Sequence, residues 1–300
     1  MRFAEDRLDS FRGRAGVPRT VHIWEPPASA RPPLLRCVLL ALHGGMAHGG
    51  DWVTPALYLR ARGIATAAFD LCGHGAGRRA DIPDFDIFIE ETGLFLDWVR
   101  ARWPGIPVFV IGHSMGALVA TRFGLAGGKG VAGFILSSPY YVNAVAVPAA
   151  LQRLSGLLAK MVPTMKVPLA SLTDALTHDA AITARHHRDE ADGIRATEIT
   201  IRFGNALQGA QRGLSLEGWR HPLYVVLAGQ DQLADTHAAE RLLQAVPPHL
   251  LACRVEAGNR HENFNELNRD ELFADIAAWI ERTLEGRDGK KSTYRRSKWR

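Results

Sequence analysis

One serine in the sequence stands in a pattern that is typical of nucleophilic catalysis. Residues 112–116 read Gly-His-Ser-Met-Gly, directly after the apolar run PVFVI and directly before an apolar, helix-like run. The glycines Gly112 and Gly116 allow a sharp turn between a strand and a helix, which pushes the hydroxyl of Ser114 out of the turn. The N-terminus of the following helix adds backbone N–H groups and a positive dipole end. Ser114 is therefore predicted to be a catalytic nucleophile.

A serine hydroxyl attacks a carbonyl only when a base removes its proton, and a carboxylate holds that base. After such a strand-to-helix turn the expected order is serine, acid, histidine, each at the carboxyl end of a strand. Asp231 follows the apolar run LYVVLA, and His261 follows the run LLACRV. Asp235 is the alternative acid, but an acid at the start of a helix has a structural explanation. We expect Asp231 to orient His261, and His261 to activate Ser114.

The oxyanion that forms during acyl transfer needs two fixed hydrogen-bond donors. The backbone N–H of Met115, next to the nucleophile, is the first. The second is expected in the turn after the first parallel strand, which reads His-Gly-Gly-Met at residues 43–46. Glycines let the backbone approach a substrate there, so we expect Gly45 to be the donor, with Gly44 as the alternative. The same residues are also compatible with a simple tight turn.

The remaining histidines are expected to have structural roles. His113 lies inside the turn and is expected to point away from the hydroxyl, while His43 is expected to order its loop. His48 and His74 are placed where they could line the mouth of the site, without an assigned role. Three more are expected to be solvated: His178, His186 and His187.

The sequence gives no sign of a metal or a nucleotide cofactor. No Cys/His spacing fits a zinc site, and the glycines at residues 73–77 do not form a dinucleotide-binding fingerprint. We expect no metal and no cofactor. The three cysteines are expected to be buried, reduced thiols, which suits the cytosol. They are Cys37, Cys72 and Cys253.

The elements that must position these groups are strands and helices that alternate along the sequence. Apolar runs that are unbroken, as in parallel strands covered on both faces, occur at 36–42, 64–69, 107–111, 131–136, 223–228 and 250–255. Helix-length segments lie between or after them at 52–62, 85–103, 115–125, 236–245 and 266–284. This order predicts an open, mostly parallel α/β sheet with right-handed crossovers. The alternating run Thr20–Trp24 is expected at an antiparallel edge.

The alternation stops for about eighty residues between Pro139 and His221, which is too long for a structureless loop in a compact domain. Residues 140–220 are therefore expected to form a helical cap inserted into a core of residues 20–139 and 221–285. Residues 1–19 are expected to be an extension and residues 286–300 a disordered tail. One apolar helix face in the cap must cover the main domain, an acyl-sized pocket or a lipid surface. It consists of Leu151, Leu154, Leu158, Met161, Val162 and Met165.

Composition and charge limit the classes of partner. The chain has 300 residues, of which 47% are hydrophobic, so it is long enough to bury a large core and is not disordered overall. The net charge of +5 is misleading, because residues 287–300 alone carry +6 and leave −1 for the rest. We therefore expect no nucleic acid as partner. The basic tail is expected to be solvated or to contact anionic lipid.

The N-terminal residues lack the apolar run and cleavage pattern of a signal peptide, and no apolar run of membrane-spanning length is expected. We expect a soluble, cytoplasmic protein whose oligomeric state the sequence leaves open.

With these residues in place, the chain resembles the α/β-hydrolase superfamily, and within it the monoacylglycerol lipase and lysophospholipase group. The resemblance spans about residues 20–285. The matching segments are LHGG, FDLCGHG, GHSMG, LSSP, AGQDQL and HENFNELNRDELFADIAAWI. It implies Ser114 as nucleophile, Asp231 as orienting acid, His261 as base, and Gly45 with Met115 as oxyanion donors. Cys72, Ala76 and the loop at 46–50 depart from the group's usual pattern.

The resemblance implies a metal-free serine hydrolase of medium to long acyl esters, such as monoacylglycerols or lysophospholipids. Relatives that use an aspartate nucleophile are excluded, because residue 114 is serine. Two alternatives stay open: a thioesterase or amidase with the same triad, and a small-molecule-binding protein that turns its ligand over slowly or not at all. The acyl length, the alcohol group and the preference for ester over thioester or amide are not predicted.

Overall fold

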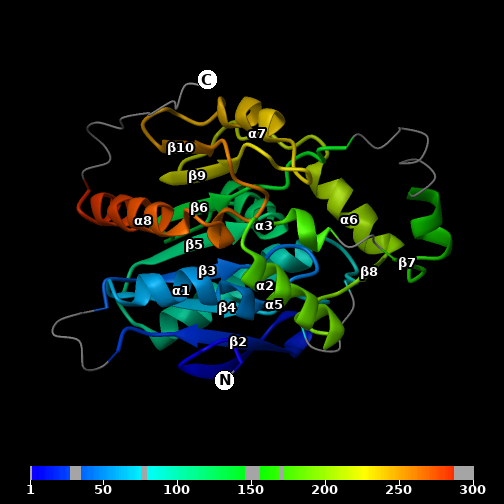
Figure 1. The fold of residues 1–300 in the computed structure, drawn as a ribbon, viewed down its shortest axis with the longest axis horizontal. Coiled ribbons are helices and arrows are strands. Elements are labelled where there is room, and N and C mark those ends of the chain that lie inside the picture. The colour runs from blue at the N-terminus through cyan, green and yellow to red at the C-terminus, as the bar shows by residue number, and fades with distance from the viewer. Residues whose placement is uncertain (1, 28–34, 76–79, 146–155, 169–171, 287–300) are drawn as a thin grey trace.

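An eight-stranded sheet forms the centre of the computed structural model (Figure 1), which describes residues 2–27, 35–75, 80–145, 156–168 and 172–286. The strand order is β1-β2-β4-β3-β5-β6-β9-β10. Pairs β1–β2 and β2–β4 are antiparallel, and the other pairs are parallel. The strands are β1 (Arg7–Arg12), β2 (Pro18–Trp24), β3 (Cys37–Leu42), β4 (Ile64–Phe69), β5 (Val108–His113), β6 (Gly133–Ser137), β9 (Leu223–Ala228) and β10 (Leu251–Glu256).

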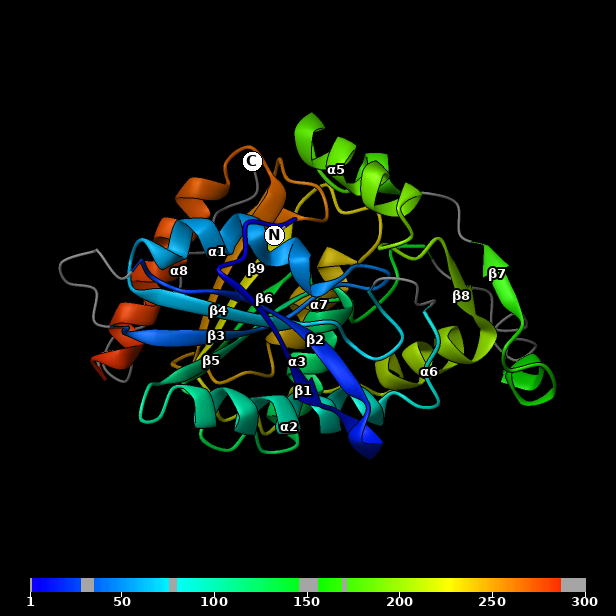
Figure 2. The same ribbon diagram turned by 90° about the horizontal axis from the view of Figure 1, so that it is seen from below.

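Helices cover both faces of the sheet, which explains why the parallel strands are apolar without interruption. Helices α1 and α8 lie on one face and α2 on the other, as Figure 2 shows. In β3, Leu40 and Leu42 belong to the apolar core under α2 and α3, whereas Leu39 and Ala41 pack into the core under α1 and α8. The core helices are α1 (Val53–Arg60), α2 (Asp86–Arg102), α3 (Met115–Leu125), α7 (Thr236–Leu243) and α8 (Arg269–Leu284), with short 3-10 turns η1 (Arg14–Gly16), η2 (Gly49–Trp52) and η4 (Asn263–Asn265).

The N-terminal segment corrects one prediction. Residues 1–19 were expected to lie outside the sheet, but Arg7–Arg12 forms β1, which pairs with β2 over its whole length. β1 is therefore the edge strand, and β2 lies one position inside the sheet. Only Phe11 of β1 is buried. The sequence of this strand carries no apolar run for that reason, and its pairing depends on backbone hydrogen bonds that a hydropathy pattern does not reveal.

The cap lies between β6 and β9 and includes a small sheet that was not predicted. Strands β7 and β8 pair antiparallel within it. Of the expected apolar face, Leu151 and Leu154 lie outside the described residues. Met161 is 69% exposed and Met165 45% exposed, so the described part of this face does not cover the main domain. The cap elements are β7 (Lys166–Pro168), η3 (Thr173–Ala175), α5 (Ala180–Ala191), β8 (Glu198–Thr200) and α6 (Ile201–Gln211).

None of the helices in the described ranges combines the length and the apolar character that crossing a membrane requires. The basic residues 287–300, predicted to be a disordered tail, lie outside the described part of the chain.

Candidate active site

The predicted nucleophile sits on a strained turn at the carboxyl end of β5. Strand β5 ends at His113 and helix α3 begins at Met115, so Ser114 alone connects them, with φ 53° and ψ −117°. A non-glycine residue rarely adopts positive φ, and such strain is typical of functional turns. The flanking glycines make the turn sterically possible. A Cβ on Gly116 would overlap the carbonyl oxygen of Leu42, and one on Gly112 would lie 2.5 Å from the carbonyl oxygen of Gly116.

The structure brings together the three residues predicted for the triad. Ser114 Oγ lies 2.8 Å from Nε2 of His261, and Nδ1 of His261 lies 2.8 and 2.9 Å from the two carboxylate oxygens of Asp231. A carboxylate only accepts hydrogen bonds, so Nδ1 carries the proton and Nε2 is left to accept the serine proton. All three side chains lie beyond the carboxyl ends of parallel strands, which places them at one edge of the sheet.

Asp231 is held as a carboxylate by its surroundings. Burial alone would raise its pKa, but the charge and hydrogen bond of His261 and two backbone donors outweigh burial and hold the pKa below its ordinary value. Those donors are the N–H groups of Leu233 and Ala234, each 2.9 Å from Oδ1. The alternative acid, Asp235, caps helix α7 by accepting from Ala238 N at 2.8 Å. Its role is therefore structural.

The loop after β3 lies against the nucleophile, as the oxyanion prediction requires. A Cβ built on Gly44 would lie 3.4 Å from Cβ of Ser114, and one on Gly45 would lie 3.9 Å from Cβ of Met115. His43 fixes this loop, because its Nδ1–H donates to Gly44 O at 2.7 Å while its Nε2 accepts from a backbone N–H at 3.0 Å. Burial lowers the pKa of His43 to about 3, so the ring stays neutral.

The sequence also matches a known protein family. Residues 35–268 match the family described as Serine aminopeptidase, S33. The chain belongs to this family.

Individual relatives of this hydrolase agree with that result. A monoacylglycerol lipase of Mycolicibacterium smegmatis is 26% identical over 279 residues, which are 90% of this chain and 95% of that protein. Phospholipase YtpA of Bacillus subtilis is 29% identical over 253 residues, or 82% of this chain and 96% of that protein. A soluble variant of the monoglyceride lipase from Saccharomyces cerevisiae, solved with a substrate analogue, has a TM-score of 0.79 at 19% identity, covering 93% of this chain and 95% of that one.

These comparisons confirm the predicted α/β-hydrolase fold. They also confirm the predicted likeness to the monoacylglycerol lipase group and, with it, the prediction of a carboxylic ester hydrolase. The roles of individual residues rest on the geometry of this chain and are taken up below.

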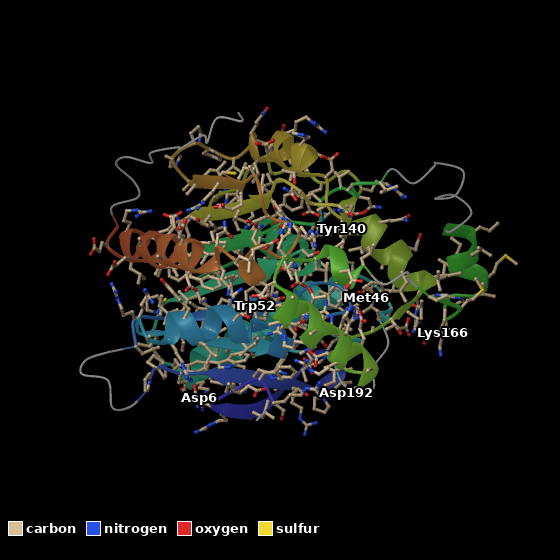
Figure 3. The ribbon with its side chains drawn as sticks, in the orientation of Figure 1. Asp6, Met46, Trp52, Tyr140, Lys166 and Asp192 are labelled. Atoms are coloured by element: carbon tan, nitrogen blue, oxygen red, sulfur yellow. The ribbon has the colours of Figure 1, made fainter. Side chains whose placement is uncertain are left out.

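The triad of the hydrolase opens into a cavity of about 490 Å³ between core and cap. That volume lies in the range of sites for small organic ligands. Met46 lies where the core meets the cap, while Lys166 marks the outer end of the cap (Figure 3). The apolar wall comes from both parts of the molecule and includes Met46, Trp52, Pro55, Leu172, Leu176, Ile199, Phe203, Leu207 and Phe264.

Two other histidines near the nucleophile have structural surroundings. His113 contacts Ser137, with its Nδ1 3.4 Å from Oγ, but its ring lies 4.9 Å from that of His261 and lines the cavity, so the expectation that it points away from the site is not confirmed. Burial, assisted by the nearby His261, lowers the pKa of His113 to about 4. His74 does not line the mouth of the cavity, contrary to expectation. It is buried beside His43, with ring centroids 5.1 Å apart.

Three histidines were expected to be solvated, and this prediction is confirmed only in part. His178 and His187 are both exposed, as predicted, and His178 contacts Glu266. His186 is fully buried, so its prediction was wrong. It sits on the face of α5 that meets the core, where the carboxylate of Glu262 accepts from its Nε2 at 2.8 Å. The sequence around His186 is polar and therefore predicts a solvated side chain, because its partner carboxylate lies far away along the chain and cannot be recognised from that segment.

His48 is also buried, in a cluster of charged side chains rather than at the mouth. His48, Asp51 and Asp189 bring one potential metal-ligand atom each within 4.8 Å of one another. Arg195 donates to Asp51 and Arg2 donates to Asp189, both at 2.6 Å. Each carboxylate is thus already paired with a guanidinium, and we interpret the group as a salt-bridge cluster. The expectation that the reaction needs no metal or cofactor stays a prediction.

The cysteines are all free thiols. Burial raises the pKa of Cys37 and of Cys253 to about 12, so neither is a thiolate near neutral pH. Cys72 and Cys253 are half-buried rather than buried, a small correction to the prediction.

Proposed function

We propose that this hydrolase cleaves medium to long acyl esters of an uncharged alcohol, with monoacylglycerols as the substrate class, through an acyl-enzyme on Ser114. The observation that supports this most is the Ser114–His261–Asp231 chain of hydrogen bonds at the floor of an apolar cavity. An acyl chain needs an apolar cavity, and ester cleavage needs the activated hydroxyl at its end.

The proposed reaction begins when Ser114 Oγ attacks the ester carbonyl while His261 Nε2 takes the hydroxyl proton. Asp231 stabilises the imidazolium that forms. The N–H groups of Met115 and Gly45 donate to the oxyanion, which collapses and expels the alcohol, and His261 returns the proton to the leaving oxygen. A water molecule, deprotonated by the same histidine, then attacks the acyl-enzyme and releases the carboxylic acid with Ser114 restored.

The charges of the cavity favour an uncharged head group over a phosphate. Its charged lining residues, within the described part of the chain, are three acids and one arginine: Asp51, Glu190, Glu262 and Arg195. The guanidinium of Arg195 is committed to Asp51 at 2.6 Å. A phosphate would thus meet carboxylates without a free cation to pair with, which disfavours lysophospholipids.

The cap supports a proposal of contact with a lipid surface. Met161 is 69% exposed and Leu157 55% exposed on one cap segment, and Val145 near the start of the cap is 75% exposed. Exposed large apolar side chains fit the interface of a bilayer. The residues 287–300, with net charge +6, would add attraction to anionic lipid. Because the free cysteines fit a reducing compartment, we also propose a cytoplasmic location.

A substrate panel with Ser114→Ala as control tests the catalytic proposal. The wild type is assayed on a monoacylglycerol, a lysophospholipid of the same acyl chain, the matching acyl thioester and the acyl p-nitroanilide. We expect the highest kcat/KM on the monoacylglycerol and no turnover in the Ser114→Ala protein. Turnover by the variant would exclude Ser114 as nucleophile, and a preference for the lysophospholipid or the anilide would overturn the substrate assignment.

Labelling by a fluorophosphonate distinguishes an enzyme from a binding protein. Wild-type protein is expected to be labelled at Ser114, and folded His261→Ala protein is not. Absence of labelling in the folded wild type would favour a protein that binds a small molecule without turning it over.

A further inference from the structure

We propose that Arg195, a cap residue, is a positioning residue. It holds the oxyanion loop and the loop of the catalytic histidine in fixed positions relative to each other. The oxyanion loop is here residues 43–51, and the histidine loop is residues 259–266. The inference rests on the proposed roles of Ser114, His261 and the oxyanion loop. It means that the cap is required for the chemical step and does more than bind the acyl chain.

Arg195 occupies a junction of three segments and is 7% exposed. Its Nη1 donates to Asp51 Oδ2 at 2.6 Å and to His186 Nδ1 at 3.0 Å, and its Nη2 lies 3.8 Å from Glu262 Oε1. A guanidinium only donates, so Nδ1 of His186 must accept, and the proton on its Nε2 is donated to Glu262 at 2.8 Å. One cap cation thus bridges the carboxylates of both loops, once directly and once through His186.

On the oxyanion side, the cap holds the loop at two points. Asp51 lies in η2 near the end of the loop and is bound by the Arg195 side chain. The next cap residue, Ala196, donates its backbone N–H to the carbonyl oxygen of Met46 at 2.9 Å. Met46 directly follows Gly45, the proposed oxyanion donor. The position of Gly45 therefore depends on contacts that come from the cap.

On the histidine side, the cap contacts the residue next to the base. Glu262 directly follows His261 and is buried. Its backbone N–H donates to the cap carbonyl of Leu176 at 2.9 Å, and its Oε2 accepts from Asn265 Nδ2 at 2.7 Å as well as from His186. The backbone of His261 is thereby fixed at its C-terminal side by cap residues.

Removal of the guanidinium would leave two buried carboxylates, Asp51 and Glu262, without their shared cation. Asp51 would keep the more distant Arg185, whose Nη2 lies 3.5 Å from Oδ1, and Glu262 would keep its hydrogen bond from His186. Buried charges that are compensated only in part are unfavourable, so the two loops would move apart or admit water. A displacement of about 1 Å in a catalytic group lowers a rate by about 100-fold. A lysine would restore the charge but not the planar fork that reaches two partners.

A second cap arginine provides a matched control. Arg202 on α6 donates from Nε to Asp81 Oδ1 at 2.6 Å, and its Nη2 bonds Asp81 Oδ2. This pair also joins the cap to the core. Asp81 precedes α2 and belongs to neither catalytic loop, so Arg202 attaches the cap without touching the proposed machinery.

The test compares Arg195→Met, Arg195→Lys and Arg202→Met on p-nitrophenyl acetate, an ester too short to fill the acyl cavity. Thermal melts first establish that each variant is folded. For Arg195→Met we expect kcat to fall by about 100-fold, with KM changed by less than about threefold and the rate of fluorophosphonate labelling reduced in parallel. Arg195→Lys is expected to recover part of kcat, and Arg202→Met to keep kcat within about twofold of wild type.

Two outcomes would overturn the proposal: a kcat for Arg195→Met close to that of wild type, or an equal loss in Arg202→Met. If Arg195→Met does not fold, Asp51→Asn and Glu262→Gln replace it, because they keep shape while removing one charge each. Both are expected to lower kcat by at least about tenfold. An unchanged kcat in both variants would refute the positioning role of Arg195. Turnover by Ser114→Ala would instead refute the catalytic assignment itself, so the two failures are distinguishable.

Discussion

The sheet and the cap place polar and apolar side chains in opposite ways. In the central strands β3, β4 and β9 every side chain is buried and, apart from Thr66, apolar, and the polar groups of the site stand at the strand ends. In the cap, His186 and Asp189 are fully buried, whereas Met161 is 69% exposed. The cap thus combines buried charged groups with exposed apolar side chains. It makes specific polar contacts to the catalytic loops on one side and offers apolar surface on the other.

The molecule also contains two charged clusters, which join different segments to the core. The Arg195 cluster joins the cap to the catalytic loops. A second cluster, formed by His22, Glu5 and Asp70, joins the N-terminal strands to the core. The second one touches the oxyanion loop too, because Asp70 Oδ1 accepts from Gly49 N at 2.8 Å. The first is expected to govern rate and the second stability, and the predictions below test that division.

The largest effect is expected at the acid of the triad. Asp231→Asn should lower kcat by about 10⁴-fold, because an amide no longer selects the tautomer with the proton on Nδ1 of His261. The matched control is Asp235→Ala, in which the N-cap of α7 is lost. That variant should keep kcat and lose about 1 kcal/mol of stability in a denaturant melt. Loss of kcat in Asp235→Ala with activity retained in Asp231→Asn would reverse the assignment.

The buried His22 is expected to make stability depend on pH. Burial alone would lower its pKa, but the carboxylate of Asp70, 3.6 Å from Nε2, and the hydrogen bond to Glu5 at 2.7 Å outweigh burial and raise the pKa to about 9. A raised pKa stabilises the fold fully below the unfolded value of about 6.5, and this contribution is lost as pH rises through about 9. Its size is about 3 kcal/mol.

Denaturant melts of wild type and His22→Gln at several pH values from 6 to 9.5 measure this contribution. The difference in free energy of unfolding should be largest at pH 6 and shrink toward pH 9.5. His237→Gln, a change at an exposed histidine on α7, is the control for replacing a histidine and should show only a small difference in free energy of unfolding. A difference for His22→Gln that is constant across this range would rule out the charged state of His22 as its source.

Sequence reasoning located the core and the candidate triad because both follow local patterns. Strands β4 and β9 and helix α3 have the predicted bounds to the residue. The two strands are apolar runs that end before Asp70 and Gly229, and α3 begins directly after the turn at Ser114. Parallel strands end at one edge, so residues that follow separate strands meet there. That rule predicts that Ser114, Asp231 and His261 lie together.

The cap and its charged cluster could not be read in the same way. Glu262 and His186 are 76 residues apart, and Arg195 and Asp51 are 144 apart. A buried ion pair at such separation leaves no periodic signal, because each residue alone looks like an exposed charge. The apolar face at Met161 and Met165 could be located from its period but not assigned a partner. The period indicates a face that covers something apolar, and it does not distinguish protein from lipid as that partner.

The length of the acyl chain can be tested at one glycine of α6. Gly204 lines the cavity, and a Cβ there would find its nearest neighbour at 3.6 Å, the Cδ1 of Ile199. Gly204→Leu should fill part of the cavity and lower kcat/KM for a dodecanoyl ester by about 10-fold, while a butyryl ester is cleaved as before. Gly209→Leu on the same helix is the control, since no neighbouring atom lies within 4 Å and the residue does not line the cavity. Equal effects of the two variants on both esters would show that the acyl chain lies elsewhere.

The smallest effect is expected from single apolar residues at the proposed lipid contact. Met161 on the cap and Leu267 on the core, just before α8, are exposed to nearly the same extent, 69% and 72%. If the cap meets the bilayer, Met161→Ser should weaken sedimentation with anionic vesicles by about fivefold, because about 1 kcal/mol of apolar burial is lost when a partly inserted side chain is replaced. Leu267→Ser should leave vesicle binding unchanged, and both variants should keep their thermal stability because neither side chain is packed. Equal weakening by the two substitutions would mean that exposed apolar area in general, and not the cap, governs the contact. The cap would then be a polar support for the catalytic loops alone.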